Sequence, residues 1–433
     1  VMGQNLTNFD AMLKEFYPKD VVLDLIKSKA PFYFEFQKSK RISADGRRVI
    51  QPIHSARNTG VSALGEGGLL PTAGNQGYVD LTIPFKYVYG RVDISGPVMK
   101  QTRTSQGAFD DVMDQEIEGA IKDGARDLSR QLQGFGTGIL CNISDTDASA
   151  THSLINGQGV ADNDDIPGRF LKAGMIVAGI TPSTLAWEFV RTISSVSADM
   201  KTVVFTATVT PAEAGTILVR QGSASGTALA DTGYAREIMG LLGMVDDGTY
   251  VSTYFGLTRS STTGLYAHRM DLGAGNLSLD IMHRAFHAVD QSGDGKIGML
   301  LANQATAREY YGLLQVMKRY VDAKALSPDG GLKRRADNAG YDIEFNQVPV
   351  REDRDVPLGI IHGLDMDSFR RYSITEGEWA DDDGRILLRN ATTDSYEGRL
   401  RVLFGNAACL APNRNFTISS IKLNTGIDAI NVF

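Results

Sequence analysis

The sequence predicts an α+β fold with an extended β-ribbon. Beyond Tyr234, strands and helices interleave without a regular βαβ period, which favours α+β over a doubly wound parallel sheet. Residues 41–96 alternate apolar and polar side chains around a glycine-rich tip, as a long two-stranded ribbon does. An amphipathic helix at 105–133 follows the ribbon. A two-stranded ribbon is only marginally stable alone in water and cannot bury itself, so we expect its apolar stripe and unpaired edges to lie on another chain.

Length and composition limit the class of protein. A chain of 433 residues, 42% of them hydrophobic, can bury a sizeable core and should hold roughly two or three domains. The net charge of -7 argues against tight DNA binding by the whole molecule, but it allows loose contact through a local basic face. Cys141 and Cys409 provide no disulfide framework and suit a reducing cytoplasm. The sequence contains neither a signal-peptide pattern nor an apolar run of the ~18 residues that a membrane span needs.

The first forty residues are predicted to form a helical arm rather than a domain. Apolar residues recur at helical spacing from Phe9 to Tyr17, and a second short helix is expected at Val21–Ser28. A basic segment follows, and three interpretations stay open: a solvated strand face, a strip that meets acidic surface on a neighbouring subunit, or direct DNA readout. Its residues are Lys38, Lys40, Arg41, Arg47 and Arg48.

The return limb of the ribbon alternates cleanly. Its apolar face runs from Val79 to Tyr87 and Tyr89, and the pattern changes parity near Val88–Gly90, which indicates a bulge or a bend. The glycine-rich tip contains few large apolar residues, and we expect a neighbouring chain to cover them. They are Val61, Leu64, Leu69 and Leu70.

The helix at 105–133 is the best-defined element. One continuous apolar stripe runs from Phe109 to Phe135, so we expect the helix to lie on a sheet. Ser105 suits the N-cap, and the glycines of the following GFGTG end the helix. That glycine-rich segment lacks the lysine and the Ser/Thr of a phosphate-binding loop, which favours a helix terminator.

A small barrel is predicted in the middle of the chain. Residues 141–166 are polar and acidic and are expected to form an exposed loop. From 167 to 232, short apolar strands alternate with turns, which is typical of a small barrel or sandwich able to fold independently. Trp187 and Phe205 are expected in its core.

Catalytic and metal-binding patterns are incomplete. His283 and His287 have the spacing of a helical zinc pair, but Arg284 occupies the place of the glutamate base. Asp290–Gly298 resembles the start of a calcium loop, but Leu301 replaces its final acidic ligand. The sequence therefore predicts no catalytic, cofactor-binding or metal-binding residues and no enzyme.

The order of these parts resembles a major capsid protein of a tailed double-stranded DNA bacteriophage, of the HK97-like family. Four segments carry the resemblance beside the arm, ribbon and helix. They are GLLGMVDDGTYV (Gly240–Val251), the helix-then-strand LDIMHRAFHAVDQSGDGKIGMLLANQATAREYY (Leu279–Tyr311), VPVREDRDVPLGIIHGLDMDSF (Val348–Phe369) and the closing RLRVLFGNAACLAPNRNFTISSI. The last fits one long strand with Pro412 near its middle.

The resemblance implies an HK97-like fold with an inserted small β-barrel domain. The helix at 105–133 would be the spine of a peripheral domain, joined in space by 277–289 and 395–425. The implied parts are an N-terminal arm (1–40), an extended loop (41–96), the peripheral domain with its spine helix (97–140), an exposed loop (141–166), the inserted barrel (167–232), the axial domain (233–276 and 297–370), a peripheral helix and turn (277–296), and peripheral strands with the C-terminus (371–433).

The implied function is self-assembly of pentamers and hexamers into an icosahedral shell around phage DNA. The implied partners are further copies of the chain, portal and scaffolding proteins, decoration proteins, and packaged DNA by loose contact only, with no membrane. The implied location is the virion, assembled in the cytoplasm of the host bacterium. Two alternatives stay open: an encapsulin-like shell protein of a cellular nanocompartment, and an unrelated enzyme or surface β-protein.

Overall fold

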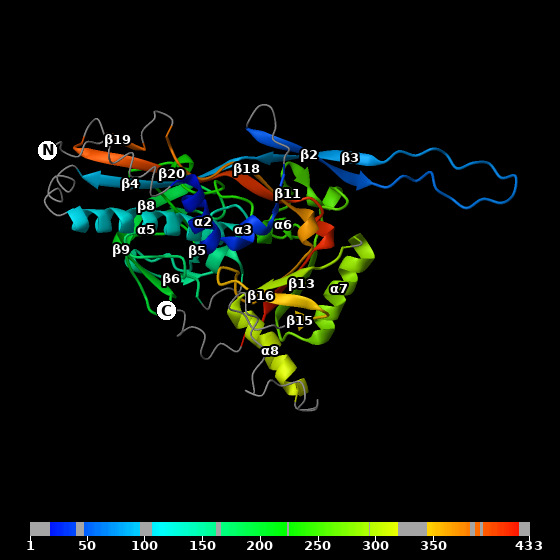
Figure 1. Ribbon diagram of the computed structural model, residues 1–433. Coiled ribbons are helices and arrows are strands. Elements are labelled where there is room, and N and C mark those ends of the chain that lie inside the picture. Colours follow the sequence, from blue (N-terminus) through cyan, green and yellow to red (C-terminus); the bar gives the residue numbers. More distant parts are fainter. Residues whose placement is uncertain are drawn as a thin grey trace, which may run out of the picture.

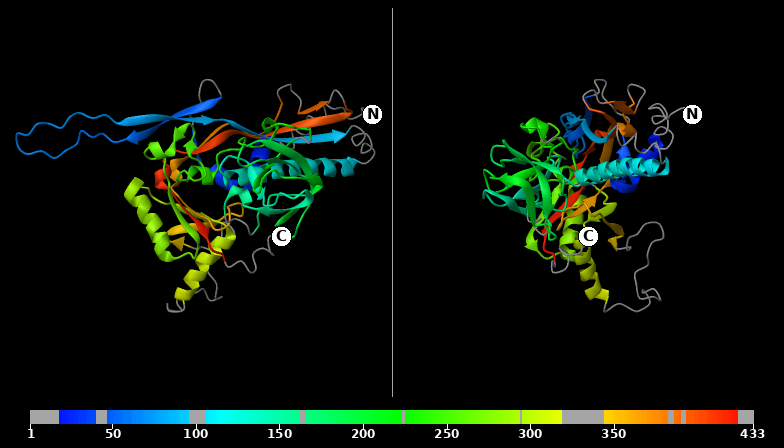
Figure 2. Two further views of the ribbon diagram at one scale, coloured as in Figure 1. Left: turned by 180° about the vertical axis from the view of Figure 1, so that it is seen from behind. Right: turned by 90° about the vertical axis from the view of Figure 1, so that its left-hand side faces the viewer.

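The chain is built from two hydrophobic cores, a closed barrel and a projecting loop at 57–76, and from here on this loop alone is called the extended loop (Figure 1). Each core includes a β-sheet, and the loop reaches far beyond the body of the molecule (Figures 1 and 2). The structure is a computed structural model and describes residues 18–39, 47–95, 106–161, 166–222, 225–293, 295–318, 344–381, 386–389 and 393–423.

The first core lies between a long helix and the first sheet. Helix α5 (Gln106–Leu132) packs on strands β4 (Lys86–Ser95) and β20 (Ser395–Cys409), as its single apolar stripe predicts. The helix approaches the sheet closely at Gly124, where an added Cβ would lie 2.7 Å from Val402 Cγ2. The remaining strands of this sheet are β18 (Phe369–Trp379), β19 (Leu387–Arg389) and β1 (Gln37–Lys38).

The segment before the ribbon belongs to the first core, so the prediction of an arm is wrong for residues 18–39. Helix α2 (Lys19–Lys29) packs on α5 and β18, and α3 (Pro31–Glu35) follows it. Their apolar side chains are covered by the chain itself rather than by a neighbour. The predicted helix over Phe9–Tyr17 lies outside the described residues. The buried side chains are Val22, Ile26, Phe32, Tyr33 and Phe36.

The root of the ribbon is buried, contrary to the prediction that the ribbon cannot bury itself. Strands β2 (Arg48–Ala56) and β3 (Gly77–Pro84) pair antiparallel. Their inward side chains pack in the first core, and only the loop at 57–76 projects away from the body (Figures 1 and 2). The buried residues of the root are Val49, Ile53, Leu81 and Ile83.

Tyr87 and Tyr89 point to solvent, so their predicted place on the apolar face is wrong. The inward face changes parity between Phe85 and Val88, where β3 ends and β4 begins to pair with β20. The two tyrosines are 51% and 61% exposed. The register shift on this pairing lies in β20, opposite Val88 and Tyr89. The predicted bulge is therefore found at this point of the pairing, on the partner strand.

The barrel begins earlier than predicted. Strands β5 (Ile139–Ile143) and β6 (Ser149–Ile155) close it, so the prediction of an exposed loop at 141–166 is wrong. Leu140, Cys141 and Leu154 lie in the same interior as Phe205, whereas Trp187 is only partly buried beside it. The other barrel strands are β7 (Ile176–Ile180), β8 (Trp187–Val196), β9 (Thr202–Val209) and β10 (Thr216–Arg220).

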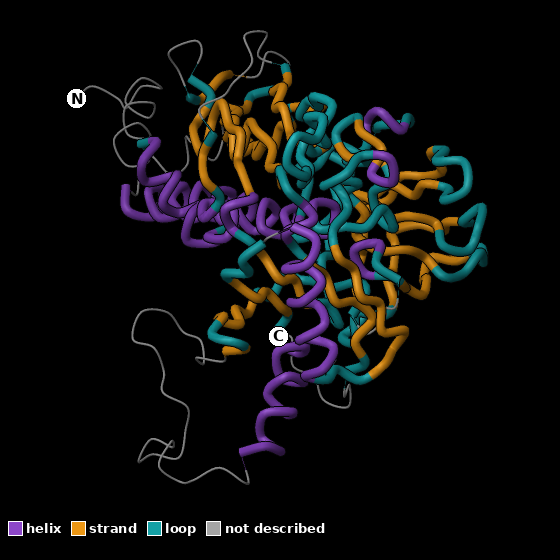
Figure 3. The backbone as a smooth tube through the Cα atoms, turned by 90° about the vertical axis from the view of Figure 1, so that its right-hand side faces the viewer, coloured by secondary structure: helices purple, strands orange, loops and turns teal. Residues whose placement is uncertain are grey.

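The second core lies against the second sheet, which has the order β13-β21-β17-β14-β16-β15. Helices α7 (Leu279–Gly293) and α8 (Gln304–Lys318) lie beside it, apart from α5 (Figure 1). Figure 3 shows the helices in purple and the strands in orange from the right-hand side of that view. The strands are β13 (His268–Gly275), β21 (Phe416–Ile421), β17 (Ile361–Leu364), β14 (Met299–Ala302), β16 (Val348–Glu352) and β15 (Glu344–Phe345).

Three predicted domain assignments are therefore wrong. The segment 277–296 was expected beside the spine helix, but α7 contacts β13 and β21 of the second sheet. The segment 233–276 was assigned to one domain, yet residues from Ile238 to Ala267 pack in the first core and only β13 joins the second sheet. The closing segment is two strands in different sheets, because the chain turns at Pro412–Arg414 between β20 and β21. Proline lacks the N–H that a continuous ladder needs.

Candidate functional site: the extended loop and the barrel junction

The extended loop exposes the apolar residues that the sequence singled out. Val61, Leu64, Leu69 and Leu70 are 84%, 48%, 92% and 87% exposed. Residues 57–76 form no strand, and their backbone groups pair with neither the first nor the second sheet. The loop thus offers apolar side chains that its own chain leaves in water, where a partner could bury them.

A second apolar surface lies on the outer face of the first sheet. Tyr87 and Tyr89 each contact the Phe404 ring edge-on, with ring centroids 5.1 and 5.0 Å apart. The Arg401 guanidinium lies 5.5 Å from the centroid of Phe404. The extended loop points away from β4, so its tip lies far from this aromatic face (Figure 1). Exposed tyrosines suit interfaces because they combine a large apolar area with a polar end.

The predicted basic strip is only partly described. Lys38 forms an ion pair with Glu376 of the same chain at 3.4 Å. Arg47 and Arg48 are exposed at the start of β2. Lys40 and Arg41 lie outside the described residues.

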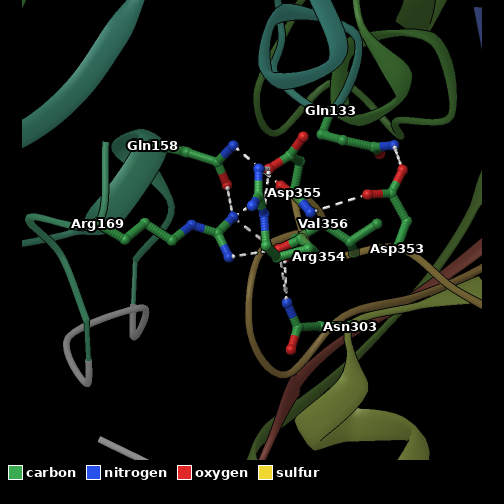
Figure 4. Close-up of polar contacts among 8 residues, drawn as sticks. All are labelled: Gln133, Gln158, Arg169, Asn303, Asp353, Arg354, Asp355 and Val356. Atoms are coloured by element: carbon green, nitrogen blue, oxygen red, sulfur yellow. Dashed lines mark hydrogen bonds and ion pairs between the residues drawn. The ribbon is translucent and has the colours of Figure 1, made fainter. Parts of the chain in front are cut away.

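The barrel meets the connection between β16 and β17 at a buried polar junction (Figure 4). Arg169 lies between β6 and β7, and its guanidinium donates to the carbonyl oxygens of Arg354, Asp355 and Val356 at 3.1, 2.7 and 3.1 Å. Gln158 accepts from Arg169 at 2.8 Å and donates to the carbonyl of Asp355 at 3.2 Å. The barrel therefore holds three consecutive carbonyls of the connection between β16 and β17, whose Val356 side chain packs in the first core.

The same connection is also held from the start of α8 and from the end of α5. Asn303, at the start of α8, donates to the carbonyls of Arg354 and Val356 at 3.0 and 2.9 Å. Gln133 donates to Asp353 Oδ2 at 2.8 Å, and the other oxygen of Asp353 accepts from the Asp355 N–H at 2.8 Å. Burial raises the pKa of Asp353 and lowers that of Arg169 to about 10. The junction is therefore desolvated, and its polar groups depend on one another.

A second attachment joins the barrel to α5. Asp127 accepts from Arg220, the last residue of β10, at 3.2 Å, and from Arg130 at 3.1 Å. Arg130 also binds Glu237, on the segment that leaves the barrel. Arg169 and this network could not be predicted from the sequence, because a buried polar residue produces no periodic pattern in its own segment.

The described residues contain no group of three or more His, Cys, Asp or Glu side chains suited to a metal ion. The His283 and His287 rings lie 6.2 Å apart between centroids, and His283 packs against Phe345. Of the calcium-like segment, Ser292 lies in α7 and contacts His268, while Asp294 is outside the described residues. Within the described ranges, no helix is long and apolar enough to cross a membrane.

Acid should destabilise the fold through His362 on β17. Burial lowers the pKa of His362 to about 3, so the folded chain keeps this imidazole neutral. Its Nδ1 lies 2.9 Å from Thr417 Oγ1, which donates to the carbonyl of Val245. The unfolded chain binds a proton below the ordinary pKa of about 6.5, so the free energy of unfolding falls as the pH drops below that value. The expected slope is up to about 1.4 kcal/mol per pH unit.

Urea denaturation at about pH 7 and about pH 5 measures this dependence. His362→Gln should reduce the difference between the two pH values, because glutamine has no proton to gain. The matched variant His287→Gln changes an exposed histidine and should keep the parent's difference. An unchanged difference in His362→Gln would contradict the assignment.

The fold matches that of a solved phage structure. A chain of the "Cyanophage A-1(L) capsid asymmetric unit" aligns with a TM-score of 0.50 and 11% identity, covering 91% of this chain and 93% of that chain. Structures titled "Mycobacterium phage Bobi" (12% identity, covering 89% of each chain) and "Capsid of native GTA particle computed with C5 symmetry" (10% identity, covering 90% of each chain) align with TM-scores of 0.42. No family model and no curated protein sequence matches the chain. The chain therefore has the fold of the cyanophage A-1(L) capsid chain.

Proposed function

We propose that the chain is the major capsid protein of a tailed double-stranded DNA bacteriophage with an HK97-like fold. The observation that carries the proposal is the loop at 57–76, whose large apolar side chains are exposed in the isolated chain. The shared fold with a phage capsid chain supports the same function. In this assignment the first and second cores correspond to the peripheral and axial domains, and the protein acts as a structural component rather than an enzyme.

The two exposed apolar surfaces suit contact between copies. The loop tip and the aromatic face of Tyr87, Tyr89 and Phe404 are different surfaces, so one copy can offer its tip to the face of the next. Such a head-to-tail contact is heterologous, and it generates a ring where the rotation closes. Rings of this kind are the pentamers and hexamers that an icosahedral shell requires.

The wider biological setting belongs to the same proposal. The chain would assemble in the cytoplasm of the host bacterium and end in the virion, with portal, scaffolding and decoration proteins as partners. Packaged DNA would touch the shell only loosely, which agrees with the net charge of -7.

Electron microscopy and sedimentation velocity of the purified protein test the function. We expect closed particles tens of nanometres wide. A chain that stays monomeric over a wide range of concentrations, with and without co-expressed scaffold, would contradict a capsid function.

Tyr87→Ser combined with Tyr89→Ser tests the aromatic face. We expect loss of closed particles with an unchanged circular dichroism spectrum, because both side chains face solvent and contribute little to the core of the isolated chain. Tyr266→Ser changes another exposed tyrosine, 50% exposed, and should assemble normally. Normal particles from the double variant would show that the tip contacts a different surface.

A further inference from the structure

We propose that the barrel is locked to the body of the molecule by contacts beyond its two ends, and that Arg169 is the residue that positions it. The sequence suggests an independent insert joined to the body only by its two ends. Both ends leave the barrel near the C-terminal end of α5, where Arg220 contacts Asp127. An attachment at the two ends alone leaves a hinge, whereas a further contact with the connection between β16 and β17 fixes the orientation of the barrel.

The Arg169 junction has the geometry of such a second contact. A planar guanidinium donates to carbonyls in fixed directions, so three acceptors on one segment determine position and direction together. The guanidinium also lies over the Phe170 ring, 4.5 Å from its centroid, which limits its movement. A lysine ammonium could not span the three carbonyls in the same way.

The backbone on the barrel side is specialised for the same contact. Asn156 and Gln158 adopt left-handed conformations with φ of 50° and 58°, which are costly for residues other than glycine. This turn directs the Gln158 amide toward both Arg169 and the Asp355 carbonyl. Such strain persists only where surrounding contacts hold it, which makes the turn part of the junction.

The consequence for assembly rests on the proposed function. Copies in a shell can repeat the same contacts only if each copy presents its surfaces in the same relative position. A barrel that swings on its hinge would vary in position from copy to copy. Arg169 would then affect the uniformity of the shell without touching a neighbouring chain.

Spin-label distance measurements on the unassembled chain test the lock. Labels go on cysteines introduced at Ala207, exposed on the barrel strand β9, and at Arg284, exposed on α7 beside the second sheet. The two natural cysteines, Cys141 and Cys409, are buried. We expect one narrow distance distribution in the parent and its loss in Arg169→Met, which keeps the apolar stem of the side chain but removes every donor.

The control is Arg191→Met. Arg191 is a barrel arginine whose described contacts, with the carbonyls of Val190 and Thr208, stay inside the barrel. This variant should keep the narrow distribution. Hydrogen exchange of the β5–β10 amides establishes that the barrel is folded in each variant, so that a broad distribution reports swinging rather than unfolding.

The outcomes separate the lock from the proposed function. A broad distribution in Arg169→Met with a protected barrel supports the lock, and a distribution as narrow as the parent's overturns it. If the barrel amides of Arg169→Met are not protected from hydrogen exchange, the width of the distance distribution is measured in Arg169→Lys instead. Lysine keeps the positive charge but lacks the planar guanidinium. Absence of particles from the parent would refute the capsid function. The spin-label distances would still test the attachment of the barrel, because they are measured on the unassembled chain.

Discussion

Deleting residues 61–76 should give a chain that folds normally but forms no closed particles. The deletion joins Gly60 to Gly77, and residues 57–60 then form a short connection between Ala56 and Gly77, which already pair across the hairpin. The isolated chain loses little, because the removed large apolar side chains are exposed. The assembled state should lose roughly 1.5–3 kcal/mol for each leucine that a neighbour buries, and the loss is repeated in every subunit.

Circular dichroism measures the fold of the deletion variant, and sedimentation velocity with electron microscopy measures assembly. Point substitutions separate the loss of the apolar side chains from the shortening of the loop. Leu69→Ser combined with Leu70→Ser should also prevent assembly, whereas Leu185→Ser, at a barrel leucine that is 41% exposed, should not. Heat-stable particles from the deletion variant would refute the assignment of the loop as an intersubunit clamp.

Replacing Arg259 by methionine should cost about 3–5 kcal/mol of unfolding free energy. Arg259 is only 2% exposed and donates to the carbonyls of Val251, Asp246 and Leu265 at 2.9, 3.0 and 2.6 Å, and to that of Gly243. Methionine would leave these carbonyls buried without a donor. The Asp246 carboxylate would also lose its neighbouring positive charge, although its bonds to backbone N–H groups would remain.

The effect should extend to the root of the ribbon. Arg259 stacks over Tyr254, 4.4 Å from the ring centroid, and the next residue, Phe255, accepts from the Thr82 N–H in β3 at 3.2 Å. We therefore expect faster hydrogen exchange at Thr82 as well as a lower urea midpoint. Arg284→Met, which removes an exposed ion pair on α7, should cost less than about 1 kcal/mol. A similarly small loss of unfolding free energy in Arg259→Met would contradict the stabilising role of the four carbonyl contacts of Arg259.

Local sequence patterns determined the elements that a single segment can specify. The stripe from Phe109 to Phe135 requires a long helix with one buried face, and α5 is that helix. The glycine-rich tip requires exposure, because its scattered leucines cannot form a core, and Leu69 and Leu70 are indeed exposed. The order of these elements was enough to suggest a phage capsid fold, which the structural match supports.

Contacts between distant segments decided the rest. Tyr87 and Tyr89 face solvent because β4 leaves the ribbon at Phe85 and pairs with β20, more than three hundred residues later in the chain. The sequence of β6 is typical of a polar loop, since this strand buries only His152 and Leu154. The barrel interior that receives them exists only after the other barrel strands have closed around it.

The buried polar residues depend most strongly on tertiary structure. Arg169 and Arg259 look like surface arginines in the sequence, because burying a charge is unfavourable unless fixed acceptors surround it. Those acceptors are main-chain carbonyls, which every residue carries and no sequence pattern reveals. The sequence by itself therefore determined the long helix, the alternating ribbon strands and the exposed loop tip. The tertiary structure decided which surfaces meet, since only the folded backbone brings its carbonyls together around a buried charge.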